Sequence, residues 1–385
     1  MEKAEQHRAG AQFSRRAALG VVGAAAAAAV VRPGIAAGTD TALSKDTLIV
    51  NSLAPLDDFY GDGTPPRTGR NVVSEAGILA ALQSGLTATN YSLKNGTFQE
   101  AVANLGQFDA QIRSDPRLRK IWTAQDIRAA KAANQVGIIY GWQNTLALDD
   151  DASRVDIFAD LGLRIMQLTY NSLNRSGGGS MDKTLAGLTP FGREVIERLN
   201  ARRLVVDLSH SGRPILMDSV MASKQPICIS HTGCAAVAPS PRNKTDEELR
   251  AVAERGGYVG IYFIMYLKPY SLYDSSAVVA HIEHAIKVCG EDNVGIGSDY
   301  GALGPNPDRA KRDKFWADLV AKRVADGSAA EGDDPRYQPW PTDMEGPEQF
   351  RVLAAALRRR GFKTAQIEKI FGLNFLRYLE TIWGA

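Results

Sequence analysis

The feature that most constrains the fold of this chain is a regular alternation of two kinds of segment. Short runs rich in Val and Ile recur eight times, and amphipathic stretches with helical spacing lie between most of them. A strand followed by a helical crossover leads to a parallel neighbour, so the alternation predicts a parallel sheet. Eight such strands fit a closed barrel better than an open sheet. The predicted fold class is therefore α/β, a (β/α)₈ TIM barrel.

The expected strands are short and rich in β-branched residues, at residues 47–53, 85–90, 136–140, 164–169, 204–208, 226–230, 258–263 and 294–298. The expected helices have amphipathic spacing, at residues 74–83, 97–113, 123–134, 190–201, 213–223, 245–255 and 278–289. Two stretches, 176–180 and 301–343, are irregular in sequence and predict loops, and long loops are usually functional or disordered. The sequence returns to a helical pattern from residue 345.

The N-terminus predicts an export signal. Residues 14–19 read Ser-Arg-Arg-Ala-Ala-Leu, an apolar run follows at 21–31, and the small residues Gly34, Ala36 and Ala37 offer a cleavage site. A membrane anchor is the alternative, but this apolar run is shorter than the ~20 helical residues that span a bilayer. We therefore expect a Tat signal peptide at 1–37, one barrel domain at 38–385, and a periplasmic or secreted protein without stable membrane anchoring.

Charge and cysteine content exclude several kinds of protein. The net charge is +2, from 45 basic and 43 acidic residues, which gives no electrostatic reason to expect a nucleic-acid partner. The three cysteines, Cys228, Cys234 and Cys289, are an odd number without zinc-type spacing. They argue against a disulfide framework and against a thiolate metal site.

Three side chains follow predicted strands at positions that carry chemistry in α/β barrels. His210 and His231 each end a Ser-His pair after a strand, and Asp299 follows the last strand. Because active sites of such barrels lie at the C-terminal ends of the strands, these groups can converge on a metal ion. Asp299 can equally serve as a general base. The other pair, His281 and His284, has helical i, i+3 spacing and is expected to cap or pack a helix.

An ordered series of motifs then resembles the renal (membrane) dipeptidase family from about residue 47 to the C-terminus. The motifs are Leu-Thr-Pro-Phe-Gly-Arg-Glu at 188–194, Val-Asp-Leu-Ser-His at 206–210, Ile-Ser-His-Thr at 229–232, Pro-Arg-Asn at 241–243, Gly-Ser-Asp-Tyr-Gly at 297–301 and Gly-Leu-Asn-Phe at 372–375. The resemblance implies a barrel of the metal-dependent hydrolase type, with two bridged zinc ions, that cleaves dipeptides. It also implies roles for four residues: His210 and His231 as zinc ligands, Arg242 for the substrate carboxylate, and Asp299 as proton acceptor.

The chain departs from the family at three strand ends. Where the family has His-x-Asp after the first strand, this sequence has Leu53 and Pro55. Gln143 stands in place of the bridging glutamate, and Tyr170 in place of the substrate-side histidine. A neutral amide cannot offset the repulsion between two close dications, so the two-metal centre is not expected to form.

A reduced site remains, which predicts about one zinc ion. Its ligands are His210 and His231, with either Asp299 or the Gln143 amide oxygen as the third, because catalytic zinc commonly has three protein ligands. Asp57 or Asp58, which lie just past the first strand, are alternatives that could replace the metal ligands missing at Leu53 and Pro55. Besides Arg242, we expect Tyr170 and Asn171 to face the substrate, with Tyr170 either a hydrogen-bond donor or part of the pocket wall.

Three hypotheses follow for the function. The first is a hydrolase of dipeptides or related amides with a reduced zinc site. The second is an exported enzyme of different chemistry that tailors a secreted peptide, because a fold does not fix a function. The third is a non-catalytic binding protein that kept the pocket and lost the metals. All three predict a small peptide-like ligand, and the family resemblance adds a possible homodimer.

Overall fold

The computed structural model describes residues 43–56, 73–327 and 329–384, which lie within one compact unit at 41–385. The predicted signal peptide and the alternative ligands Asp57 and Asp58 lie outside these residues. Within the described ranges, no helix is long and apolar enough to cross a membrane.

The strands form one parallel sheet in the order β1-β2-β4-β5-β6-β7-β8-β9, and a short strand, β3, pairs beside the start of β4. Two backbone hydrogen bonds join the first strand to the last: Ser52 N donates to Ile296 O over 3.0 Å, and Asp299 N donates to Leu53 O over 2.9 Å. The eight predicted strands and the α/β barrel are confirmed. The strands are β1 Val50–Asn51, β2 Ala88–Ser92, β3 Leu118–Lys120, β4 Val136–Trp142, β5 Leu163–Gln167, β6 Val205–Asp207, β7 Cys228–Thr232, β8 Tyr258–Ile261 and β9 Val294–Ile296.

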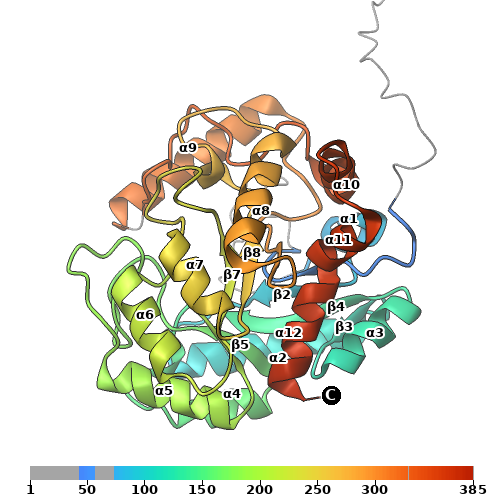
Figure 1. Cartoon of the computed structure of the whole chain (residues 1–385). Coiled ribbons are helices and arrows are strands. Elements are labelled where there is room, and N and C mark those ends of the chain that lie inside the picture. The colour runs from blue at the N-terminus through green and yellow to red at the C-terminus, as the bar shows by residue number, and fades with distance from the viewer. Residues whose placement is uncertain (1–42, 57–72, 328, 385) are drawn as a thin grey trace, which may run out of the picture. The chain divides into compact units, whose positions relative to one another are not determined.

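Helices lie around the outside of the strands (Figure 1). Three of them begin at a threonine whose hydroxyl accepts the N3 backbone N–H while the N3 carboxylate accepts from the threonine, a reciprocal cap: α2, α3 and α7. The helices are α1 Glu75–Ser84, α2 Phe98–Ser114, α3 Ala124–Ala132, α4 Arg154–Asp160, α5 Pro190–Ala201, α6 Arg213–Ala222, α7 Asp246–Ala253, α8 Ser275–Cys289, α9 Arg309–Ala325, α10 Gln349–Arg359, α11 Thr364–Glu368 and α12 Asn374–Trp383. Short helical turns lie at η1 Leu146–Leu148, η2 Met265–Leu267, η3 Gly346–Glu348 and η4 Lys369–Leu373.

Residues 301–343 were predicted to be an irregular loop, and this was wrong for the first half of the segment. That stretch contains α9, whose first turn is capped by Asp308 accepting from Ala310 N and Lys311 N. The helix is rich in charged residues and buries mainly Phe315, Trp316 and Val320, so its apolar stripe is too narrow to be conspicuous in the sequence. The predictions also omitted β3 and α4, which are short.

Small residues let the strands close tightly around the barrel axis. Ser52 Oγ donates to Ser230 O (2.5 Å) and Ile296 O (2.8 Å), bridging β1 to β7 and β9. A Cβ atom at Gly297 or Gly260 would overlap Ser230 O, so these positions have no room for a side chain. Above this constriction, the C-terminal ends of the strands carry the polar residues singled out by the sequence.

Candidate active site

Six of the predicted site residues lie at the C-terminal ends of barrel strands, whereas Arg242 lies in the loop between β7 and α7. Asp299 follows β9 and His231 lies inside β7. The others follow the third, fourth and fifth barrel strands: Gln143 comes directly after β4, Tyr170 and Asn171 after β5, and His210 after β6. Because parallel strands end on one face of the barrel, residues far apart in the chain share one site.

His210 and His231 meet through their Nε2 atoms, which lie 3.0 Å apart. Both side chains are buried, and their ring centroids are 4.9 Å apart at an angle of 61°. The Tyr170 ring covers the other face of His210, with centroids 4.0 Å apart and planes inclined by 24°. The two imidazoles therefore have fixed orientations.

Hydrogen bonds define the tautomer of each ring. His210 Nδ1 lies 2.7 Å from Asn171 Oδ1, an amide oxygen that can only accept, so Nδ1 carries the hydrogen. His231 Nδ1 lies 2.8 Å from Ser230 Oγ, whose own hydrogen goes to Asp207, so His231 Nδ1 donates as well. Both Nε2 atoms are thus left with a lone pair.

The two lone pairs face each other, and a proton is not favoured between them. Burial, followed by the charge of Arg242, holds the pKa of His210 well below its usual range, and the same causes lower the pKa of His231. Two nitrogens bound at ~2.05 Å to one tetrahedral zinc lie ~3.3 Å apart, close to the observed 3.0 Å. The pair therefore fits two ligands of a metal ion.

A complete set of ligands does not surround this pair within the described part of the chain. There, no group of three or more His, Cys, Asp and Glu side chains is close enough to hold a metal. Asp299, the predicted third ligand, thus does not form such a group with the two histidines. Gln143, the other candidate, lines the neighbouring cavity.

Asp299 has an unusual backbone. Its φ of 50° is left-handed, a conformation that non-glycine residues rarely adopt and that Asp tolerates better than most. Desolvation raises the pKa of its carboxyl to about 6, and the charges of Arg242 and Arg323 oppose this shift. A carboxyl with this pKa changes protonation near neutral pH, as a general base requires.

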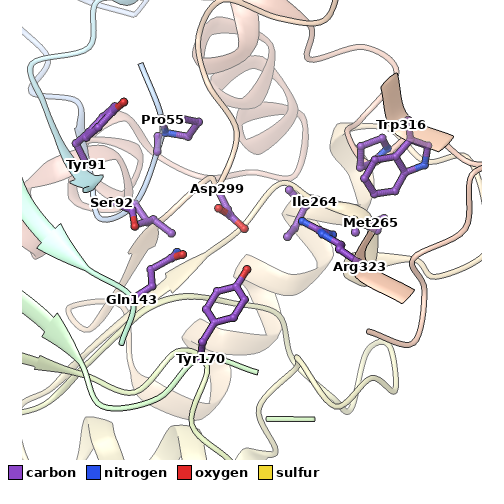
Figure 2. A pocket seen from close by; sticks show the side chains of 13 residues that line it. Pro55, Tyr91, Ser92, Gln143, Tyr170, Ile264, Met265, Asp299, Trp316 and Arg323 are labelled. Atoms are coloured by element: carbon purple, nitrogen blue, oxygen red, sulfur yellow. The ribbon is translucent and has the colours of Figure 1, made fainter. Parts of the chain in front are cut away.

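Asp299 faces a cavity of about 180 Å³ that the strand ends and α9 enclose. Figure 2 shows the Tyr170 hydroxyl and the Arg323 guanidinium both directed toward Asp299, with Gln143 and Ser92 on another side. Apolar walls come from Ile264, Met265, Trp316, Pro339 and the segment Leu53–Pro55. Apolar walls with a few polar groups directed inward are typical of small-molecule sites.

Comparison with known proteins identifies the family. The family model described as membrane dipeptidase (peptidase family M19) matches residues 74–331, more than half of the chain. The chain belongs to the membrane dipeptidase family.

Individual proteins are similar to the chain over most of its length. An amidohydrolase from Pseudomonas aeruginosa superposes with a TM-score of 0.73 and 29% identity, covering 89% of this chain and 98% of that one. An uncharacterised protein from the pqqA 5′ region of Klebsiella pneumoniae is 26% identical over 69% of this chain and 90% of its own length. A dipeptidase from Claviceps purpurea is 25% identical over 77% of this chain, and the chain spans only 62% of that protein.

This member of the membrane dipeptidase family places Arg242 behind the histidine pair. Its side chain is 1% exposed, Nη1 donates to Ser209 O over 2.7 Å, and Nη2 donates to His210 Nε2 over 3.2 Å. Arg242 is not among the described residues that line the cavity. Asn171 likewise contacts His210, where its amide oxygen fixes the ring.

The cavity also contains residues that the sequence analysis missed. Arg323 and Trp316 reach it from α9, seven positions apart on one helix. The Asp308 cap was a signal for the helix, but nothing in the sequence indicated that the helix covers the barrel.

Among the described residues, the other two histidines, His281 and His284, are structural, as predicted. His281 Nδ1 accepts from Cys234 N, and its Nε2 donates to Leu267 O. His284 lies 2.7 Å from Asp246 at the start of α7. All three cysteines are buried free thiols.

Proposed function

We propose that this protein hydrolyses the amide bond of a dipeptide or a related small amide in the cavity at the barrel mouth. The observation that carries the proposal is Asp299, a left-handed residue at the end of β9 whose carboxyl faces the cavity beside Tyr170. Membership of a dipeptidase family supports the same reaction, as does a relative from Claviceps purpurea that is named a dipeptidase.

Asp299 would remove a proton from the water that attacks the amide carbonyl. With a pKa of about 6, its carboxylate is available at neutral pH and basic enough to accept that proton. Tyr170 would donate a hydrogen bond to the carbonyl oxygen, since burial raises the pKa of its phenol and keeps it protonated. Gln143, on the opposite wall, would bind the substrate backbone through its amide.

His210 and His231 would hold a single zinc ion. When bound, zinc would supply a polarising charge for the carbonyl and lower the pKa of a bound water. Asn171 and Ser230 would hold the two imidazoles in the tautomer that leaves Nε2 available. The third protein ligand is not among the described His, Cys, Asp and Glu side chains near the pair.

The test combines metal content with turnover in the exported, mature protein. Mass spectrometry should find about one zinc per chain, lost in a His210→Ala/His231→Ala variant, and a screen of dipeptides with L or D second residues should detect release of free amino acids. The matched control is His284→Ala, which removes an imidazole outside the site. An Asp299→Asn variant should retain the metal and lose turnover. Two zinc ions per chain would contradict the reduced site, and turnover in Asp299→Asn would contradict the general base.

One observation favours a second function, a non-catalytic binding protein. The Arg242 guanidinium donates to the same His210 Nε2 atom that a metal would use. Under that alternative the purified protein contains no metal, binds a peptide-like ligand and releases it unchanged. The metal and turnover measurements distinguish the two.

A further inference from the structure

A second cavity, of about 250 Å³, lies among the loops that follow β5, β6 and β7. Among the described residues, it shares no lining residue with the cavity of Asp299. Its walls include residues 178–180 of the Gly and Ser stretch, the start of α6 at 212–214, and Lys244 before α7. The proposed hydrolysis uses none of these groups, so the cavity is open to another role.

Lys244 places a buried positive charge beside this cavity. The residue is only 2% exposed, and its ammonium group donates one hydrogen bond among the described residues, to Ser211 O, which also lines the cavity. Desolvation lowers the pKa of Lys244 to about 8, which leaves the group largely charged at neutral pH. An ammonium group has three hydrogens to donate, and its burial is unfavourable unless an opposite charge compensates it. Lys244 therefore calls for an anion on its cavity side.

The start of α6 adds partial positive charge to the same wall. This helix of 10 residues begins after Gly212, which has no side chain to accept from the first backbone N–H groups. A Cβ atom at Gly212 would lie 2.9 Å from Gly179 O, so the contact with the Gly and Ser stretch leaves little room for a capping side chain. Backbone N–H groups at a helix start, together with the helix dipole, favour an anion.

The other charged side chains of this cavity have partners of their own. Glu248 Oε2 accepts from Thr245 N over 2.9 Å and from Thr245 Oγ1 over 2.8 Å. Asp182 accepts from Thr184 N over 3.1 Å and from Thr184 Oγ1 over 2.6 Å. The exposed Arg213 guanidinium forms an ion pair with α7 over 2.5 Å. Among the described residues of this cavity, the buried ammonium group is thus the one whose charge is least compensated.

We propose that this second cavity binds a phosphate group between Lys244 and the start of α6. Lysine binds phosphate as a compact charge, and a helix start supplies N–H donors. Inorganic phosphate and a small phosphate monoester share this chemistry, and the experiment distinguishes them. Because Ser211 directly follows His210, the bound anion would also hold the loop that carries a candidate zinc ligand. The inference does not depend on the proposed hydrolysis.

The probes are inorganic phosphate and glycerol 3-phosphate, each titrated into the mature protein by isothermal titration calorimetry at neutral pH. We expect at least one of them to bind once per chain with a dissociation constant of about 1 mM or below. The probe that binds more tightly identifies the source of the phosphate group. Lys244→Met removes the charge and keeps an unbranched side chain, so it should weaken binding at least about 10-fold. Lys244→Gln, a second neutral variant, should give the same loss.

Lys224→Met is the matched control, because it removes the same charge from an exposed lysine outside the cavity. It should bind both probes as the wild type does, and melting temperatures without phosphate show that each variant folds. Removal of zinc with a chelator should leave binding unchanged, since the cavity does not contain the two histidines. The proposal is overturned if neither probe binds, if both neutral variants of Lys244 bind as tightly as the wild type, or if binding disappears with the zinc.

Discussion

At the scale of single residues, Asp299 combines two unfavourable features, a left-handed φ of 50° and a carboxyl that the fold partly desolvates. Such features persist where the surrounding structure imposes them, and they gather at active sites. Here the backbone is held by the bond from Asp299 N to Leu53 O, which also joins the two ends of the barrel. The same bond therefore contributes to closing the barrel and to positioning the candidate base.

We predict that Asp299→Asn stabilises the protein at alkaline pH. The folded pKa of about 6 lies above the ordinary 3.8, so ionisation costs stability as the pH rises from about 4 to beyond 6. Asparagine avoids that cost and tolerates a left-handed φ. The expected gain is roughly 1–3 kcal/mol at pH 8, vanishing near pH 4. Melting temperatures across that range measure it.

Asp115→Asn provides a control of opposite sign. The pKa of Asp115 is lowered, first by its hydrogen bond to Arg117, so its stabilising effect exists above the unfolded pKa and is lost as the pH falls. This variant should be less stable than the wild type at pH 8. If Asp299→Asn is also less stable than the wild type at pH 8, the prediction is wrong. The folded protein would then stabilise the ionised Asp299 carboxylate by more than its desolvation costs.

At the scale of elements, the junction of β6 and β7 depends on side chains. These strands share a single register pair, Asp207 opposite Cys228. Asp207 is fully buried and accepts from the backbone N–H and the hydroxyl of both Ser209 and Ser230. Its carboxylate therefore replaces part of the missing backbone ladder, and it orients His231 through Ser230.

We predict that Asp207→Ala lowers the free energy of unfolding by about 3–5 kcal/mol, because four buried donors lose their acceptor. Zinc affinity should fall about 10-fold to 100-fold, since the partner of His231 is no longer held. Denaturant unfolding and chelator competition measure the two effects. Asp126→Ala, which removes the acceptor from the exposed cap of α3, should cost only about 1 kcal/mol and leave zinc binding intact. Equal losses in the two variants would contradict the role assigned to Asp207.

At the scale of the whole molecule, we propose that the protein folds in the cytoplasm and is exported by the Tat pathway to the periplasm or beyond. The three buried free thiols show a fold that needs no oxidising compartment. A small peptide-like substrate suits a protein placed outside the cytoplasm. The expected homodimer stays a prediction.

We predict that Arg15→Lys combined with Arg16→Lys prevents export and leaves the signal uncleaved, because the twin arginines are the recognised pattern. In the wild type, mass spectrometry of the exported protein should give a chain that begins near Gly38. Arg8→Lys, outside the motif, should export normally. Normal export of the double variant would contradict the Tat assignment.

The sequence by itself determined the barrel and most of its strand-end chemistry. Period and crossover patterns act locally, and the strand ends of a parallel barrel necessarily meet on one face, so His210, His231 and Asp299 could be assigned to one site from the sequence pattern. The predicted structural roles of His281 and His284 also followed from helical spacing alone. The resemblance to the membrane dipeptidase family, rather than the pattern, placed Gln143 and Tyr170 at that site and made the replacements at Leu53, Pro55 and Gln143 visible.

Only the tertiary structure decided which arginine faces the cavity. The motif around Arg242 predicted a substrate contact, but its direction depends on Ser209 and His210, which are 32 or more positions away in the chain. Arg323 has no motif, and its place over the barrel follows from the packing of α9 and from Asp333 rather than from any local pattern. Long-range packing depends on shape and burial across the whole fold, and these are physical quantities that short-range sequence periods do not contain.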